Sequence, residues 1–238
     1  MRPQQFIEKF REAFGNNAPL PLALWYSNEA LVSTCRLPRC MVGAIRRVCD
    51  GDTLTLSTEN VQCGGGGLYT SFRPMPERVP LFVSETEHYK ATPEMVRDYV
   101  ERLELQITER PYLNITRVDK LESWDDVEAV VFFATPDILS GLCTWAYYDN
   151  NADDAVVSKF ASGCAAIVAF ATVENRKGGK RCFLGMLDPS ARPLVPKNEL
   201  SFAVPMSRLS EMLATLPNSA LYHKAFSAIR RRIDGEIG

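Results

Sequence analysis

The stretch EAVVFFATPDILSGLCTWAY, residues 128–147, gives the clearest indication of the fold. Residues 128–134 form a largely apolar run rich in valine and phenylalanine, which predicts a buried strand. Thr135-Pro136-Asp137 follows directly and predicts the start of a helix that extends through Tyr147, because proline is favoured at the first helical position. A buried strand that leads straight into a helix indicates a fold of mixed helices and strands.

The same signals recur on both sides of this stretch. Apolar residues at helical spacing predict an amphipathic helix over residues 4–14 and another near the C-terminus around Phe226 and Ile229. Thr92-Pro93-Glu94 predicts the start of a long helix over residues 93–109. The expected fold class is α+β (mixed α/β). Further strands are expected at residues 21–27, 53–57, 81–84, 181–187 and 200–204, and further helices at residues 41–48, from Gly163 to the turn at 176–180, and around Leu209 to Leu216.

The order of the expected elements is similar in residues 20–110 and residues 127–216. Each part contains a strand, a helix preceded by a cysteine, a strand with glycine, another strand and a long helix, so that Cys40 matches Cys164. We therefore expect a single domain, residues 1–238, built from two related, interlocked halves. The alternative is that α/β proteins repeat such units without duplication, because the spacing between matching residues is not constant.

Composition and charge argue against several classes of protein. Lys and Arg number 27 against 29 Asp and Glu, so the chain lacks the basic excess of nucleic-acid binders and no nucleic-acid partner is expected. The longest apolar run, residues 165–173, is shorter than the roughly 20 residues that a membrane-spanning helix needs. No apolar secretory segment follows the first residues. We expect a cytoplasmic protein with no membrane partner, in which the seven cysteines are mostly free thiols.

The run CGGGGLYTSF, residues 63–72, places four glycines directly after a cysteine. A phosphate-binding P-loop would need Lys and Ser or Thr after the last glycine, and a dinucleotide fingerprint would need glycine where Tyr69 stands. Neither nucleotide-binding motif is therefore present in this run. Two interpretations remain: a bulged strand or wide turn packed closely against a neighbour, or a wall of bare amides lining a pocket with Cys63 at its lip.

Two more cysteines stand where helices are expected to begin. The positive end of a helix lowers the pKa of a thiol, and Arg39 beside Cys40 would add to this effect, so Cys40 and Cys164 are candidates for reactive or anion-binding positions. Burial as ordinary packing residues is the alternative. No Cys-x-x-Cys pair is present, so a metal site would need cysteines from different segments. In DPSAR, Asp188 and Arg192 either pair with each other or recognise a carboxylate or phosphate.

Three segments carry a recognisable pattern: RCMVGAIRRVCDGDTLTLSTENVQCGGGGLYTSF, YYDNNADDAVVSKFASGCAAIVAF and FLGMLDPSARPLVPKNELSFAVPM. Together they resemble the uncharacterised family called domain of unknown function 169, from about residue 20 to the end. The resemblance implies one domain and assigns no activity. The residues that it singles out are Cys40, Cys63-Gly64-Gly65, Ser162-Gly163-Cys164, Gly185 with Asp188 and Arg192, and the strand from Phe202 to Pro205.

The leading functional hypothesis is a pocket that binds a small, anionic ligand or cofactor of unknown identity. One alternative is a thiol- or metal-dependent redox enzyme, and another is an interaction or assembly domain without a ligand. The sequence leaves enzymatic activity, cofactors and oligomeric state open. The expected ligand-binding residues are Cys40, Cys63, Gly64, Gly65, Gly66, Gly67, Cys164, Asp188 and Arg192.

Overall fold

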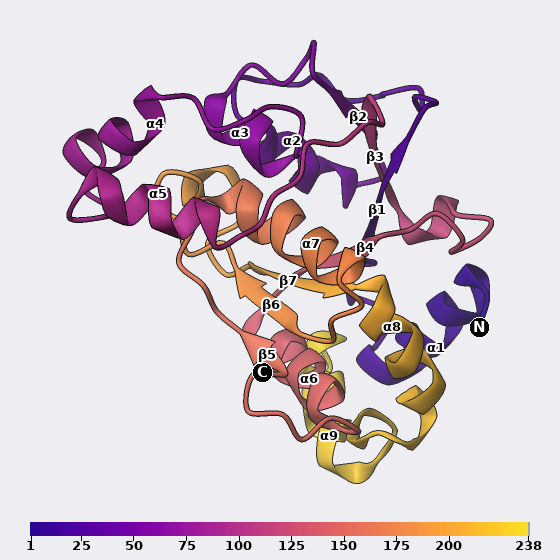
Figure 1. The fold of residues 1–238 in the computed structure, drawn as a ribbon. Helices are drawn as coiled ribbons and strands as arrows, with labels where there is room; N and C mark the ends of the chain where they lie inside the picture. Colours follow the sequence, from indigo (N-terminus) through magenta and orange to yellow (C-terminus); the bar gives the residue numbers. More distant parts are fainter. Residues whose placement is uncertain (238) are drawn as a thin grey trace.

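The computed structural model describes residues 1–237 and shows a mixed α+β fold in three layers (Figure 1). One mixed sheet of seven strands within these residues separates two layers of helices. The strand order is β2-β3-β1-β4-β7-β6-β5, and all neighbouring pairs are antiparallel except β5 with β6. The strands are β1 (Leu22–Ser27), β2 (Thr53–Ser57), β3 (Tyr112–Arg117), β4 (Ala129–Ala134), β5 (Val156–Val157), β6 (Cys182–Gly185) and β7 (Leu200–Pro205).

Strand β4 lies at the centre of the sheet and is buried along its whole length. It pairs with β1 on one side and with β7 on the other. Because successive side chains of a strand point to opposite faces, Val131 and Phe133 enter one core while Val130 and Phe132 enter the other. The apolar run at residues 128–134 is thus explained by burial on both faces.

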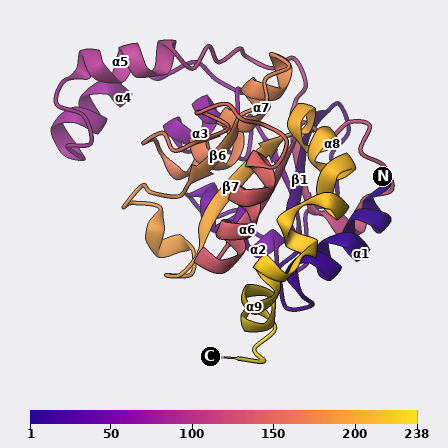
Figure 2. The same ribbon diagram turned by 90° about the horizontal axis from the view of Figure 1, so that it is seen from below.

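The helices on one face are α2 (Met41–Val48), α3 (Gly64–Tyr69) and a continuous helical run from Gly163 to Arg176. This run contains the π-helix η3 (Ala165–Ala169) followed by α7 (Phe170–Arg176). The opposite face carries α1 (Pro3–Phe14), α6 (Pro136–Tyr147), α8 (Met206–Thr215) and α9 (Lys224–Ile233), which bring the two ends of the chain into one core (Figure 2). The helices expected over residues 4–14, 41–48 and 136–147 are confirmed.

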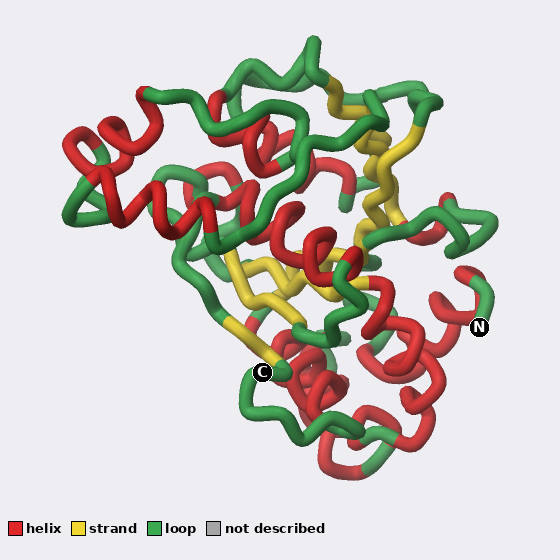
Figure 3. The backbone as a smooth tube through the Cα atoms, in the orientation of Figure 1, coloured by secondary structure: helices red, strands yellow, loops and turns green. Residues whose placement is uncertain are grey.

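A helical arm projects from the first of these faces (Figures 1 and 2). It consists of α4 (Arg78–Leu81), the π-helix η1 (Phe82–Thr86) and α5 (Pro93–Glu101), joined to the body by long loops that are green in Figure 3. The strand expected at residues 81–84 is therefore wrong, because this apolar stretch continues a helix. The helix expected over residues 93–109 begins as predicted but ends at Glu101, and Glu104 has a positive φ of 53° that no α-helix accommodates.

The glycine run forms the first turns of α3, so the expected bulged strand or wide turn is also wrong. Glycine is a poor helix former, by about 0.8–1.0 kcal/mol per residue relative to alanine, and tertiary contacts override this preference. At Gly67 a Cβ atom would lie 2.6 Å from the Arg73 Nε, and Arg73 donates a hydrogen bond to the Val61 carbonyl. The missing side chain therefore makes room for a guanidinium group.

Strand β3 was not predicted, although Leu113 and Ile115 alternate with polar residues in YLNITR. It pairs with both β1 and β2 and joins them into the sheet. The strand order is symmetric when β1 is matched with β4, β3 with β7 and β2 with β6. Duplication of two halves over residues 20–110 and 127–216 stays a prediction. In the part of the chain that the structure describes, no helix is long and apolar enough to cross a membrane.

Candidate functional site

A cavity of about 200 Å³ lies between α2, α3, the arm and the start of the helical run at Gly163. Most of its wall is apolar, and a smaller set of thiol, hydroxyl and carboxyl groups gathers on it. Ligand sites in proteins commonly combine an apolar wall with a few placed polar groups. The lining residues used below are Cys40, Val42, Cys63, Gly65, Tyr69, Phe82, Val83, Glu87, Tyr89, Lys90, Tyr99, Phe160, Ala161, Ser162, Gly163, Cys164, Asp188 and Ser190.

Three cysteines reach the cavity from three different helix starts. Cys40 is the N-cap of α2, Cys63 is the N-cap of α3, and Cys164 lies in the first turn of the run from Gly163. Their side chains differ in accessibility: Cys63 is exposed, Cys40 is partly buried and Cys164 is buried. The Cys164 Sγ lies 3.2 Å from the Ser162 Oγ. Residues far apart in sequence are thus assembled by the packing of helix ends on one face of the sheet.

Asp188 links the cavity wall to the loop after β6. Its Oδ2 accepts a hydrogen bond from the Gly163 backbone N–H at 3.0 Å, and its Oδ1 accepts bonds from the Ser190 N–H and hydroxyl. The carboxylate therefore neutralises the positive end of the helical run. At Gly163 a Cβ atom would lie 2.8 Å from the Ala191 Cβ, so glycine allows this loop to pack against the helix.

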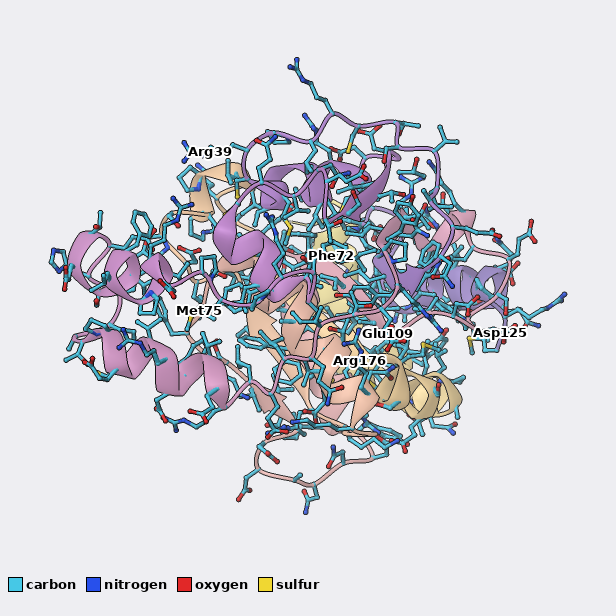
Figure 4. The ribbon with its side chains drawn as sticks, turned by 45° about the horizontal axis from the view of Figure 1, so that its top comes forward. Arg39, Phe72, Met75, Glu109, Asp125 and Arg176 are labelled. Atoms are coloured by element: carbon cyan, nitrogen blue, oxygen red, sulfur yellow. The ribbon has the colours of Figure 1, made fainter. Side chains whose placement is uncertain are left out.

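The ionisation of the thiols differs from the expectation. Burial raises the pKa of Cys40, and it raises the pKa of Cys164 to about 12. Neighbouring thiols and Asp188 add to both shifts, because a second negative charge is unfavourable there. Arg39 is exposed and lies at the outer edge of the molecule, whereas Phe72 lies near its centre (Figure 4). The prediction of low-pKa thiols at these two helix starts is therefore wrong.

Two tyrosines and a glutamate also line the cavity, Tyr69 from α3 and Glu87 and Tyr99 from the arm. The Tyr99 hydroxyl of α5 is buried and has no hydrogen-bond partner within the described residues. Burial raises the pKa of both Tyr99 and Tyr69, and Tyr69 raises the pKa of Tyr99 further. Burial also raises the pKa of Glu87, with a smaller contribution from Asp188. A buried hydroxyl without a partner is costly, so Tyr99 marks a position where a ligand acceptor would be stabilising.

The arm closes the cavity through aromatic contacts. The ring of Tyr89 meets the ring of Phe160 edge-on, with centroids 5.6 Å apart. The Lys90 Nζ lies 5.4 Å from the centroid of the Tyr99 ring, within the range of a cation–π interaction. Phe82 lines the cavity and is nevertheless 49% exposed, so the entrance is apolar. These arm residues were not predicted, because nothing in the sequence links the arm to the cysteine segments.

The remaining predicted residues have other roles. Arg192 does not line the cavity; its guanidinium donates to the carbonyls of Pro196, Lys197 and Glu199 and holds the loop before β7. The alternative in which it pairs with Asp188 is not observed either. Of the four glycines only Gly65 lines the cavity, whereas Gly64, Gly66 and Gly67 pack against Pro76, Val61 and Arg73.

All seven cysteines, which lie within the described residues, are free thiols. Among residues 1–237 no group of three or more His, Cys, Asp or Glu side chains is arranged to hold a metal ion. The three cavity thiols can donate hydrogen bonds to a ligand, and the more exposed Cys63 is open to reagents from solvent. The chemistry that this arrangement offers is therefore reversible binding together with thiol exchange.

Comparison with known proteins identifies the family of the chain but no individual related protein. No curated protein and no solved structure matches the chain. Residues 16–215 match the family described as uncharacterised ArCR, domain of unknown function 169. This match covers all strands of the sheet and every segment that lines the cavity. The chain belongs to this family.

Proposed function

We propose that the protein binds a small, mainly apolar molecule that carries one hydrogen-bonding group. The observation that carries the proposal is the cavity of about 200 Å³ with a mostly apolar wall and one unpartnered hydroxyl, that of Tyr99. An acceptor on the ligand would satisfy this hydroxyl. The apolar body of the ligand would contact the arm and α2, where Phe82, Val83 and Val42 line the cavity.

The charges around the cavity favour an uncharged ligand. Glu87 and Asp188 are both carboxyl groups, and Lys90 is the basic residue of the lining. Asp188 already occupies the positive end of the helical run through its bond to the Gly163 N–H. Because Arg192 binds backbone carbonyls elsewhere, the anionic ligand expected from the sequence gains no support from this lining.

Two probes of similar shape test the proposal. Benzamide carries a polar end and ethylbenzene does not, and both are compact enough for the cavity. We expect both to bind the wild-type protein in ligand-observed NMR. Tyr99→Phe should weaken benzamide binding by about 2–10-fold, the value of one hydrogen bond, and leave ethylbenzene binding unchanged. Tyr147→Phe is the matched control, because Tyr147 is exposed and lies outside the lining.

A second variant tests whether the probes bind in this cavity. Val83→Trp would fill the cavity from the arm and should abolish binding of both probes while the far-ultraviolet circular dichroism stays unchanged. Native mass spectrometry of the purified protein should also detect any retained compound as an added mass that is lost on denaturation. If neither probe binds and no compound is retained, or if Val83→Trp binds both probes like the wild type, the proposal is refuted.

The convergence of three thiols favours one alternative, exchange with a small disulfide. Two cysteine thiols would be oxidised to one intramolecular disulfide, and the small disulfide would be reduced to two thiols that receive the two protons. Oxidised glutathione is a suitable reagent. A loss of two hydrogens from the intact protein mass, mapped to Cys63 and Cys40 or Cys164, would support this activity. An unchanged mass after incubation would exclude it.

A further inference from the structure

A second hollow, of about 40 Å³, lies on the other side of the segment that carries Phe160 and Ser162 into the cavity. Four of its lining residues are basic and one is acidic, in contrast to the cavity. We call it the basic cleft. Its basic residues are Arg102, Lys159, Lys177 and Arg181, and its acidic residue is Glu174.

Lys159 is the unusual member of the basic cleft. Its ammonium group lies 5.6 Å from the ring centroid of Phe170 and 5.8 Å from that of Phe183. Within residues 1–237 it forms no ion pair and no hydrogen bond, although its side chain is only partly accessible. The two aromatic faces stabilise a cation and leave its N–H donors without acceptors.

Some charged groups around Lys159 lower its pKa and others raise it. Burial lowers the pKa of Lys159, and the positive charges of Arg181 and Lys177 lower it further, whereas Glu174 and Asp154 oppose the shift. The carboxylate of Glu174 is already occupied: it accepts hydrogen bonds from the Arg181 Nε at 2.9 Å and from an Arg181 terminal nitrogen at 2.7 Å. Glu174 therefore pairs with Arg181 and forms no ion pair with the Lys159 ammonium group.

Two of the other three cations, Lys177 and Arg102, form exposed ion pairs at the edge of the basic cleft, whereas Arg181 is held by Glu174. Lys177 lies 2.7 Å from a Glu104 carboxylate oxygen, and Arg102 pairs with Asp98. All four of these side chains are at least 45% exposed, and exposed ion pairs of this kind contribute little to stability. They can be exchanged for a bound anion at little cost.

We propose that the basic cleft binds one compact oxyanion, a phosphate or carboxylate group, through Lys159 with Arg102, Lys177 and Arg181 around it. An anion would supply the acceptor that Lys159 lacks and reduce the repulsion between the basic side chains. A volume of about 40 Å³ holds a group of a few heavy atoms, given that one water occupies roughly 10–15 Å³ on the same measure. The basic cleft thus provides an anion site separate from the mostly apolar cavity.

Titration with inorganic phosphate tests this proposal. Chloride at equal ionic strength gives the baseline, and acetate is the second anion to be tested. We expect phosphate to bind the wild-type protein in isothermal titration calorimetry and to raise its melting temperature. Lys159→Met keeps the apolar stem over the two rings and should weaken phosphate binding by about tenfold. Lys197→Met, at an exposed lysine outside the basic cleft, should bind phosphate like the wild type. Tighter binding of acetate than of phosphate would assign the site to carboxylates.

A labelling experiment on the wild-type chain avoids any dependence on folding of the variants. Acetylation by an N-hydroxysuccinimide ester requires a neutral amine, and we expect phosphate to slow the modification of Lys159 at least fivefold while Lys197 reacts unchanged. Equal binding of phosphate by both variants, or equal labelling of Lys159 with and without phosphate, would overturn the proposal. Tyr99→Phe should leave phosphate binding intact, so this test is independent of the cavity.

Discussion

Replacing Gly185 by alanine tests how β6 positions the helical run that begins at the cavity. The added methyl group would lie 2.3 Å from the Ala166 Cβ and 2.9 Å from the Ser201 Oγ. Because carbon atoms in contact are normally about 3.5–4.0 Å apart, the helical run would have to move away from the sheet by about 1 Å. The Cβ of Ala166 has no rotamer that could avoid the methyl group, so the backbone itself must shift.

Overpacking of this kind costs about 1–3 kcal/mol in a well-packed core. For a chain of this length each kcal/mol lowers the melting temperature by about 2–4 °C, so Gly185→Ala should lower it by roughly 2–12 °C. Urea unfolding followed by tryptophan fluorescence measures the same change as a lower midpoint. Because Gly163 and Cys164 begin the shifted helix, the affinity for benzamide should fall as well.

Gly43→Ala is the matched control in α2. Its added methyl group would meet Leu194 atoms at 3.7–3.9 Å, which is ordinary contact. Alanine is favoured over glycine inside a helix by about 0.5–1 kcal/mol, so this variant should be more stable than the wild type. Opposite signs for the two glycines would support the packing argument. A midpoint for Gly185→Ala equal to or above that of the wild type would refute it.

Three further outcomes are expected. Iodoacetamide should modify exposed Cys63 before Cys164 and Cys182, because both of these are buried with a pKa raised to about 12; peptide mass spectrometry measures the order, and early modification of Cys164 would contradict its burial. Arg192→Met should reduce the free energy of unfolding by about 1–3 kcal/mol, since three carbonyls lose their donor, and leave benzamide binding unchanged; weaker binding at wild-type stability would count against this role. The hydrogen bonds from Arg117 lower the pKa of Asp119 below its ordinary value. The Arg117–Asp119 ion pair therefore stabilises the folded protein at pH values above the pKa that Asp119 has in the unfolded chain, and this stabilisation is lost as the pH falls through the lowered pKa. Asp119→Asn should therefore be about 0.2–1 kcal/mol less stable than the wild type in urea unfolding at about pH 7, and this difference should shrink as the pH falls through the lowered pKa of Asp119; a difference that stays constant in acid would exclude this cause.

Local patterns in the sequence predicted most elements of the body and failed in the arm. Helix α2 is bounded by Cys40 and the Asp50-Gly51 turn, and β4 is a continuous apolar run, so neighbouring residues decide both. In α3 the local preference of glycine opposes a helix, and contacts with Val61, Arg73 and Pro76 override it. Those contacts are set by the fold and leave no periodic signal in the sequence.

In the candidate site, too, the residues marked by local sequence patterns were predicted and those placed by tertiary packing were missed. The cysteines and Asp188 were predicted as a set because helix starts and strand ends can be located from capping and turn signals. Tyr99, Glu87 and Lys90 were missed because the arm reaches the cavity through tertiary packing alone. The prediction of low thiol pKa values was wrong for a related reason: the helix end was correctly located, but the burial that raises the pKa depends on tertiary packing around it.

The strand order suggests why the cysteines were predicted and the arm residues were not. Matching β1 with β4 and β2 with β6 pairs α2 with the run from Gly163 to Arg176, and both helices pack on the same face and begin with a cysteine at the cavity. Between β2 and β3 the chain spans residues 58–111, whereas between β6 and β7 it spans only residues 186–199. If the two halves are duplicates, as the sequence predicts, the longer segment is an insertion in the first half, and residues 135–162, which contain α6 and β5 where the first half has only residues 28–40, are an insertion in the second. Two insertions at different places explain why the spacing between matching residues is not constant. The groups that would distinguish one ligand from another then lie in the insertion of the first half, because it supplies Tyr69, Glu87 and Tyr99 to a cavity whose other wall consists of two related helix starts.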